Sequence, residues 1–191
     1  MKKLKYSCGL ALAFLLLLAG VASADNLITN GDFSQPVDNG WTVFSTGDNG
    51  TASIVSAEAP YGDVAQTNKG RVSLYQVIPV DNLNLVLSFS GKFHTEVTKE
   101  GYGALAKVAV VYCDADTNTL GKTVFGRASG IAELKSGETE HSIIAKADNK
   151  WADYTLNIGK ELSTGLKKVD HEKIRFLRIG LTVDNGETAE C

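Results

Sequence analysis

The sequence has few cysteines, few histidines and no cluster of basic residues, and each shortage removes a class of function. Its 191 residues contain three cysteines and three histidines. The cysteines are too few and too far apart in the sequence to make a zinc site. No nucleophile-elbow motif such as Gly-x-Ser-x-Gly appears, so the signature of a serine hydrolase is missing. The formal net charge is −3 without any block of lysine or arginine, which argues against a nucleic-acid partner.

Long hydrophobic runs are also scarce, and the single example lies at the N-terminus. Three lysines precede the apolar stretch 10–18, and small residues follow it at 22–24. This order predicts a signal peptide over residues 1–24, cut before Asp25. The stretch is short for a membrane span, and a retained anchor is the alternative. Because no second hydrophobic span follows, we expect a secreted or periplasmic domain over residues 25–191.

Two cysteines remain after removal of the predicted signal peptide, Cys113 and Cys191. In an oxidising compartment these two residues can form a disulfide. The alternative is that Cys113 is a small buried apolar residue at the end of a strand.

Short β-forming segments are abundant, and clusters of Gly, Asn and Asp separate them. The clearest case is 83–95, where large apolar residues alternate with polar ones, as in a strand with one buried face. Only 161–169 looks helical, and Gly165 weakens it. Strands are predicted at 41–45, 51–57, 72–80, 83–95, 104–113, 123–126, 141–146, 151–158 and 173–184. This pattern predicts a single all-β domain, a β-sandwich or jelly roll.

The segment NLITNGDF at 26–33, followed by Gly40-Trp41, resembles the opening of carbohydrate-binding modules of the family 4/9 type. These modules are galactose-binding-like jelly-roll β-sandwiches. Further segments fit in the same order: SLYQVIPV, LNLVLSFSGKF, VVYCDADTNTLG, WADYTLNI and IRFLRIGL. The resemblance spans most of 26–184, and it implies that 26–33 forms the first strand.

The resemblance also has implications for a structural calcium ion and for the last strand. Such modules usually close with a strand of the Asp-Asp-Val type, whose aspartate helps to bind calcium beside the first strand. This sequence instead reads DNGETAEC at 184–191, so we expect either a truncated gene or an absent edge strand, and the loss would expose a sheet edge. Asp32 remains as the candidate ligand for calcium, which takes about six to eight oxygen atoms.

Binding is the function that this architecture favours. Proteins hold sugars by stacking aromatic rings on their C–H faces and by directing planar polar groups at their hydroxyls. In modules of this type the ligand lies along the concave sheet. The predicted carbohydrate-binding residues are Tyr75, Gln76, Lys92, His94, Tyr112 and Arg178. The alternatives are that the two tyrosines fill the core and that Lys92 and His94 are ordinary solvent-facing residues.

We therefore expect a secreted, non-catalytic protein that binds poly- or oligosaccharide, alone or with a separate enzyme or surface protein. One alternative is a structural or adhesive cell-surface domain that contacts protein partners through a sheet edge. A second alternative is a component associated with glycoside hydrolases. A small hydrolase would need two carboxylates facing each other in a cleft.

Overall fold

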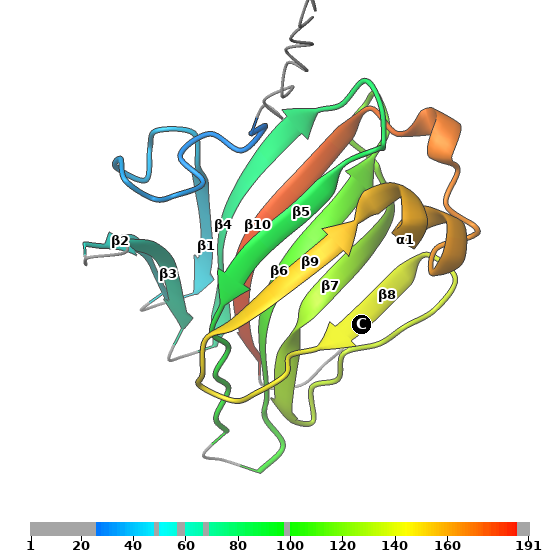
Figure 1. Cartoon of the computed structure of the whole chain (residues 1–191). Helices are drawn as coiled ribbons and strands as arrows, with labels where there is room; N and C mark the ends of the chain where they lie inside the picture. Colours follow the sequence, from blue (N-terminus) through cyan, green and yellow to red (C-terminus); the bar gives the residue numbers. More distant parts are fainter. Residues whose placement is uncertain (1–25, 48–49, 57–59, 67–68, 98–99, 187–191) are drawn as a thin grey trace, which may run out of the picture.

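The computed structural model describes residues 26–47, 50–56, 60–66, 69–97 and 100–186. The predicted signal peptide and Cys191 lie outside these residues. The described chain forms two layers of β-structure, a six-stranded sheet and a front layer of two separate strand pairs (Figure 1). Within the described residues, no helix has both the length and the apolar character needed to cross a membrane.

The six-stranded sheet is antiparallel except for one edge pair, in which β7 and β8 run parallel. The last of the described strands, β10, lies inside the sheet and pairs with both β4 and β6. Across the sheet the order of strands is β1 (Thr42–Gly47), β4 (Gly70–Pro79), β10 (Phe176–Gly186), β6 (Gly103–Cys113), β7 (Thr119–Gly130) and β8 (Glu140–Ile144).

The front layer consists of the pair β2 (Gly50–Val55) with β3 (Tyr61–Gln66) and the pair β5 (Val86–Gly91) with β9 (Ala152–Asn157). Helix α1 (Ile158–Thr164) follows β9 directly, and a 3-10 helix covers His171–Lys173. In Figure 1 the β2–β3 pair stands apart from β5 and β9, which cross in front of the large sheet.

The core fills the space between β5–β9 and the large sheet, because alternate residues of each strand point into it. Aromatic rings form its centre. Phe89 of β5 stacks on Tyr154 of β9 with ring centroids 5.1 Å apart, and its edge meets Phe125 of β7 at 5.3 Å. These contacts hold the β5–β9 pair against the large sheet, although no strand pairing joins the two layers among the described residues.

The prediction of an all-β sandwich is confirmed, and each of the nine predicted strands overlaps an observed one. Strand β3 was not predicted, and its residues include Gly62 and Asp63, which are uncommon in strands. In the predicted strand 83–95, only the β5 residues Val86–Gly91 are in a strand.

The implied first strand at 26–33 is wrong, because this segment consists of turns. Asn30 and Phe33 have φ values of 50° and 54°, which a strand does not allow. The Asn30 side chain also bonds to the backbone of Gln35 and Pro36, which fixes a loop.

The predicted helix 161–169 is displaced, since α1 begins at Ile158. The Asn157 side chain accepts a hydrogen bond from the Lys160 N–H at 2.9 Å and caps the first turn. The helix ends before Gly165, at the residue that weakened the prediction.

Candidate functional site

The six-stranded sheet has one face against the core and one face toward solvent, which we call the outer face. In β4 the alternation is clear: Val72 and Leu74 are fully buried on the core side, whereas Arg71 and Val77 are exposed on the other. The paired registers place the outer-face residues of neighbouring strands side by side. The outer face includes Phe44, Arg71, Ser73, Tyr75, Val77, Lys107, Ala109, Val111, Lys122, Glu140, Arg178, Gly180, Thr182 and Asp184.

Tyr75 lies on the outer face directly beside Gly180, its partner in β10. A Cβ atom at Gly180 would lie 2.8 Å from the Cβ of Tyr75, so the space around this tyrosine depends on the missing side chain. Phe44, 47% exposed, and Val77, 45% exposed, flank it on β1 and β4. Tyr75 therefore provides a half-buried aromatic ring within an apolar patch that faces solvent.

Arg178 lies one row further along the sheet, between Val77 of β4 and Val111 of β6. It borders a depression of about 370 Å³ that Val111, Lys122 and Glu140 also line. Lys122 and Glu140 form an ion pair across this depression at 3.0 Å. The arrangement places a guanidinium group next to a polar hollow, where it can donate hydrogen bonds to a bound molecule.

Polar groups cover the other end of the outer face. Ser73 and Thr182 share a hydrogen bond at 2.9 Å, and Arg71 Nε donates to Asp184 Oδ2 at 2.7 Å. Lys107 lies between these pairs and the Lys122–Glu140 pair. Burial is the largest cause that lowers the pKa of Lys107, and the charges of Arg71 and Lys122 lower it further. An anionic group bound here would counter that repulsion.

The structure places Gln76 on the opposite side of the sheet from its neighbour Tyr75. Its side chain is buried, donates to the carbonyl oxygen of Thr29 at 2.5 Å and accepts from the Thr29 N–H at 3.1 Å. Gln76 therefore holds the N-terminal loop against β4, and the prediction that it contacts a sugar on the outer face has to be corrected.

Tyr112 also points into the core, where it has no exposed surface. Its hydroxyl lies 3.0 Å from Thr123 Oγ1, which in turn donates to Glu161 Oε1 at 3.1 Å. Glu161 Oε1 lies 2.6 Å from His141 Nδ1. Tyr112 is thus one end of a buried polar chain, and a stacking role on the outer face is excluded for it.

Burial raises the pKa of the Tyr112 hydroxyl to about 12, against 10.0 for a free tyrosine. The unfolded chain therefore loses this proton first, so the stabilisation is complete below pH 10 and falls as the pH rises toward 12. Above pH 10 we expect wild type to lose up to about 1.4 kcal/mol per pH unit relative to Tyr112→Phe. Urea unfolding of both proteins between pH 8 and 11 measures this, and parallel curves would contradict it.

Cys113 follows Tyr112 at the end of β6 and is buried. Burial is the main cause that raises the pKa of its thiol. Since Cys191 lies outside the described residues, the disulfide between the two remains a prediction.

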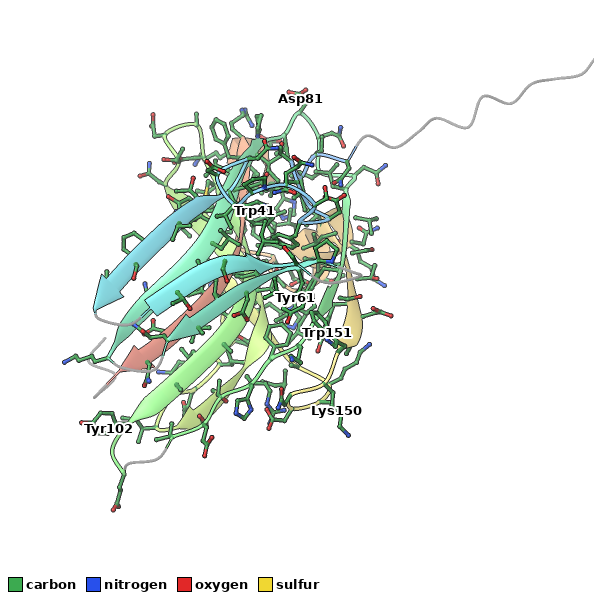
Figure 2. The ribbon with its side chains drawn as sticks, turned by 90° about the vertical axis from the view of Figure 1, so that its left-hand side faces the viewer. Trp41, Tyr61, Asp81, Tyr102, Lys150 and Trp151 are labelled. Atoms are coloured by element: carbon green, nitrogen blue, oxygen red, sulfur yellow. The ribbon has the colours of Figure 1, made fainter. Side chains whose placement is uncertain are left out.

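Lys92 and His94 lie in the front layer, on the other side of the large sheet from Tyr75 and Arg178. Lys92 Nζ is 5.8 Å from the ring centre of Trp151, which is 52% exposed. Trp151 meets Tyr61 edge-on with ring centroids 5.3 Å apart, and Figure 2 shows these two residues next to each other. His94 Nδ1 lies 3.4 Å from Asp148 Oδ1. The predicted site residues therefore do not form one site.

Asp32 lies in the exposed N-terminal loop. Its Oδ1 accepts hydrogen bonds from the N–H and hydroxyl of Ser34 at 3.2 and 3.0 Å, and these bonds lower its pKa. In the described part of the chain no group of three or more His, Cys, Asp or Glu side chains is placed to hold a metal ion. Because backbone carbonyl oxygens also bind calcium, the structural calcium ion at Asp32 remains a prediction.

Sequence reasoning missed several residues of the outer face, notably Phe44, Lys107 and the Lys122–Glu140 pair. Lys107 breaks an otherwise apolar run in β6, and this interruption was the available signal. The others become neighbours only through the strand registers.

No protein-family model matches the sequence, and no curated protein matches it. Among solved structures, one similar chain comes from a study of promiscuous carbohydrate-binding modules of the β-sandwich superfamily. It has 13% identity and a TM-score of 0.47, and the match covers 87% of this chain and 59% of that chain. This protein thus spans less than two thirds of that chain.

Another similar structure is the family 11 carbohydrate-binding module from Clostridium thermocellum, in complex with a β-1,3-1,4-mixed-linked tetrasaccharide. It has 14% identity and a TM-score of 0.43, and the match covers 82% of this chain and 94% of that chain. These values are too low to transfer a function, which has to come from the side chains themselves.

Proposed function

We propose that the protein binds carbohydrate on the outer face of the six-stranded sheet without catalysing a reaction. The supporting observation is that Tyr75 and Arg178 lie on adjacent rows of this face, between an apolar patch and a polar hollow. A sugar ring offers the matching surfaces, with C–H groups for the tyrosine and hydroxyls for the guanidinium. A sheet holds both side chains in fixed positions, so little conformational freedom is lost when a ligand binds.

The charges of the outer face favour a polymer that carries carboxylates. The cations Arg71, Lys107, Lys122 and Arg178 outnumber the anions Asp184 and Glu140 on this face. A uronic-acid polymer would place its carboxylates near Lys107 and Arg178, whereas a neutral glucan would use only stacking and hydroxyl contacts. We expect polyuronate to bind more tightly than neutral polymers, and salt to weaken that preference.

Affinity electrophoresis tests the proposal. The purified protein is run through gels that contain polygalacturonate, xylan, β-glucan, mannan or soluble chitin derivatives, with and without EDTA. We expect retardation in the polygalacturonate gel, and loss of most of it in Arg178→Ala. Lys150→Ala, which removes a positive charge from the front loop labelled in Figure 2, is the matched control.

Free migration of the folded protein through every gel would contradict the proposal. Retardation that is equal in wild type and Arg178→Ala would place the site elsewhere. An assay for new reducing ends on the retarding polymer tests the non-catalytic part, because a hydrolase would release them steadily. A fall in retardation with EDTA would indicate that a metal ion takes part.

A further inference from the structure

The front layer of the sandwich is open between its two strand pairs, apart from the ring contact between Tyr61 of β3 and Trp151 at one end. No backbone pairing links β3 to β5 in the described part of the chain. Between them lies a cleft of about 950 Å³, lined on one side by Tyr61–Gln66 and on the other by residues 87–97. This cleft is on the opposite side of the six-stranded sheet from the outer face.

The floor of the cleft is apolar and belongs to the two central strands of the large sheet. Ala104, Ala106 and Val108 of β6 and Leu181 and Val183 of β10 line it. These side chains point to the core side of the sheet, where β3 packs against β10 at one border of the cleft. Part of the apolar surface of the core therefore lines the cleft.

The edge of β5 that borders the cleft carries unpaired backbone groups. The Ile158 N–H donates to the Leu85 carbonyl at 2.9 Å. This bond shows which residues of β5 form hydrogen-bonded pairs with β9 and which do not. By the alternation of an antiparallel pair, Leu87, Phe89 and Gly91 bond to β9. Ser88, Ser90 and Lys92 therefore direct their N–H and C=O groups into the cleft, where no described strand meets them.

An extended peptide is the ligand that satisfies both features. Its backbone offers donors and acceptors in the same alternation as a strand edge, and its alternate side chains can cover an apolar floor. The size also fits. A six-residue strand, about 20 Å long, about 5 Å wide and about 10 Å deep, fills roughly 1000 Å³, close to the volume of the cleft.

We propose that a strand from another polypeptide adds to the free edge of β5 at Ser88 and Ser90 and continues past Lys92, which directly follows the strand. Apolar residues at alternate positions of that strand cover the floor formed by β6 and β10. An acidic residue between them lies opposite Lys92, whose ammonium group contacts Trp151 and pairs with no carboxylate among the described residues. The site is independent of carbohydrate binding, because the large sheet separates the two surfaces.

The test uses a fluorescein-labelled peptide, Ser-Val-Asp-Val-Asp-Val-Ser, and two control peptides. The controls have the same amino-acid sequence but carry N-methyl groups on the backbone. One control carries N-methyl groups at the three valines and the other at the two aspartates. In one of the two, the methyl groups replace the N–H donors that face β5. We expect the parent peptide to bind, one control to bind at least about tenfold more weakly, and exchange of the Ser88, Ser90 and Lys92 amide hydrogens to slow in the complex.

A pair of protein variants supplies the matched comparison. Ser88→Pro removes an N–H from the cleft edge of β5, whereas Thr155→Pro removes an N–H from the far edge of β9, at the residue directly opposite. We expect only Ser88→Pro to weaken peptide binding, and Tyr75→Ala to leave it unchanged. The proposal is overturned if the parent peptide fails to bind unmodified protein at millimolar concentration, or if both methylated peptides bind as tightly as the parent.

Discussion

Tyr75→Ala is expected to weaken binding of the retarding polysaccharide about 10- to 30-fold, or about 1.4–2 kcal/mol. The ring is half-buried beside Gly180, so it is already ordered before a ligand arrives, and its loss removes a stacking surface without freeing a flexible side chain. Isothermal titration with a soluble oligosaccharide of the same polymer measures the change. Tyr75→Phe, which keeps the ring, should retain most of the affinity.

A second variant separates the presence of the ring from its position. In Gly180→Ala the added methyl group would lie 2.8 Å from the Tyr75 Cβ, which forces the tyrosine to shift. We expect an affinity between those of wild type and Tyr75→Ala, with an unfolding transition that remains cooperative. If Tyr75→Ala binds as tightly as wild type, the aromatic platform lies elsewhere, and the exposed ring of Phe44 becomes the next residue to test.

Tyr112→Ala is expected to lower the free energy of unfolding by about 3–5 kcal/mol, as for other large aromatic residues removed from a core. Tyr112 has no exposed surface, and its hydroxyl is bonded to Thr123. The substitution leaves a cavity and also removes one partner of the buried chain that leads to Glu161. Thermal unfolding should show a fall in Tm of roughly 2–4 °C for each kcal/mol lost.

Tyr112→Phe is the control for the cavity, because it removes only the hydroxyl. We expect it to cost about 1 kcal/mol, since Thr123 keeps its bond to Glu161. Neither variant should alter sugar binding by folded protein. A folded Tyr112→Ala protein that lost binding while keeping wild-type stability would show that the ring reaches the ligand after all.

The outcome at these positions shows what a sequence can and cannot predict about a sheet. Leu177, Ile179 and Leu181 alternate with Arg178, so its outward direction follows from the sequence alone. Tyr75 and Gln76 are adjacent in a strand, and only one of two neighbours can face outward. Tyr112 lies in a nearly continuous apolar run, where no alternation shows which side chains face the core.

The sequence also does not show which strands belong to which layer of the sandwich. The alternation at 83–95 predicts a half-exposed strand, and the structure confirms it for Val86–Gly91 but not for Lys92 and His94, which follow the strand. Nothing in the local sequence shows to which layer that strand belongs. The pairing of β10 with β4 and β6 joins residues that lie far apart in the chain, such as Arg71 and Asp184. Such neighbours appear only when the registers are known.

The position of β10 also affects when the protein can fold. This strand is the last of the described strands yet lies between β4 and β6, so the two halves of the large sheet have no common partner among the described strands until residues 176–186 are in place. The contacts of β10 with β4 and β6 join residues that lie far apart in the chain, so we expect the large sheet to form slowly and late in folding.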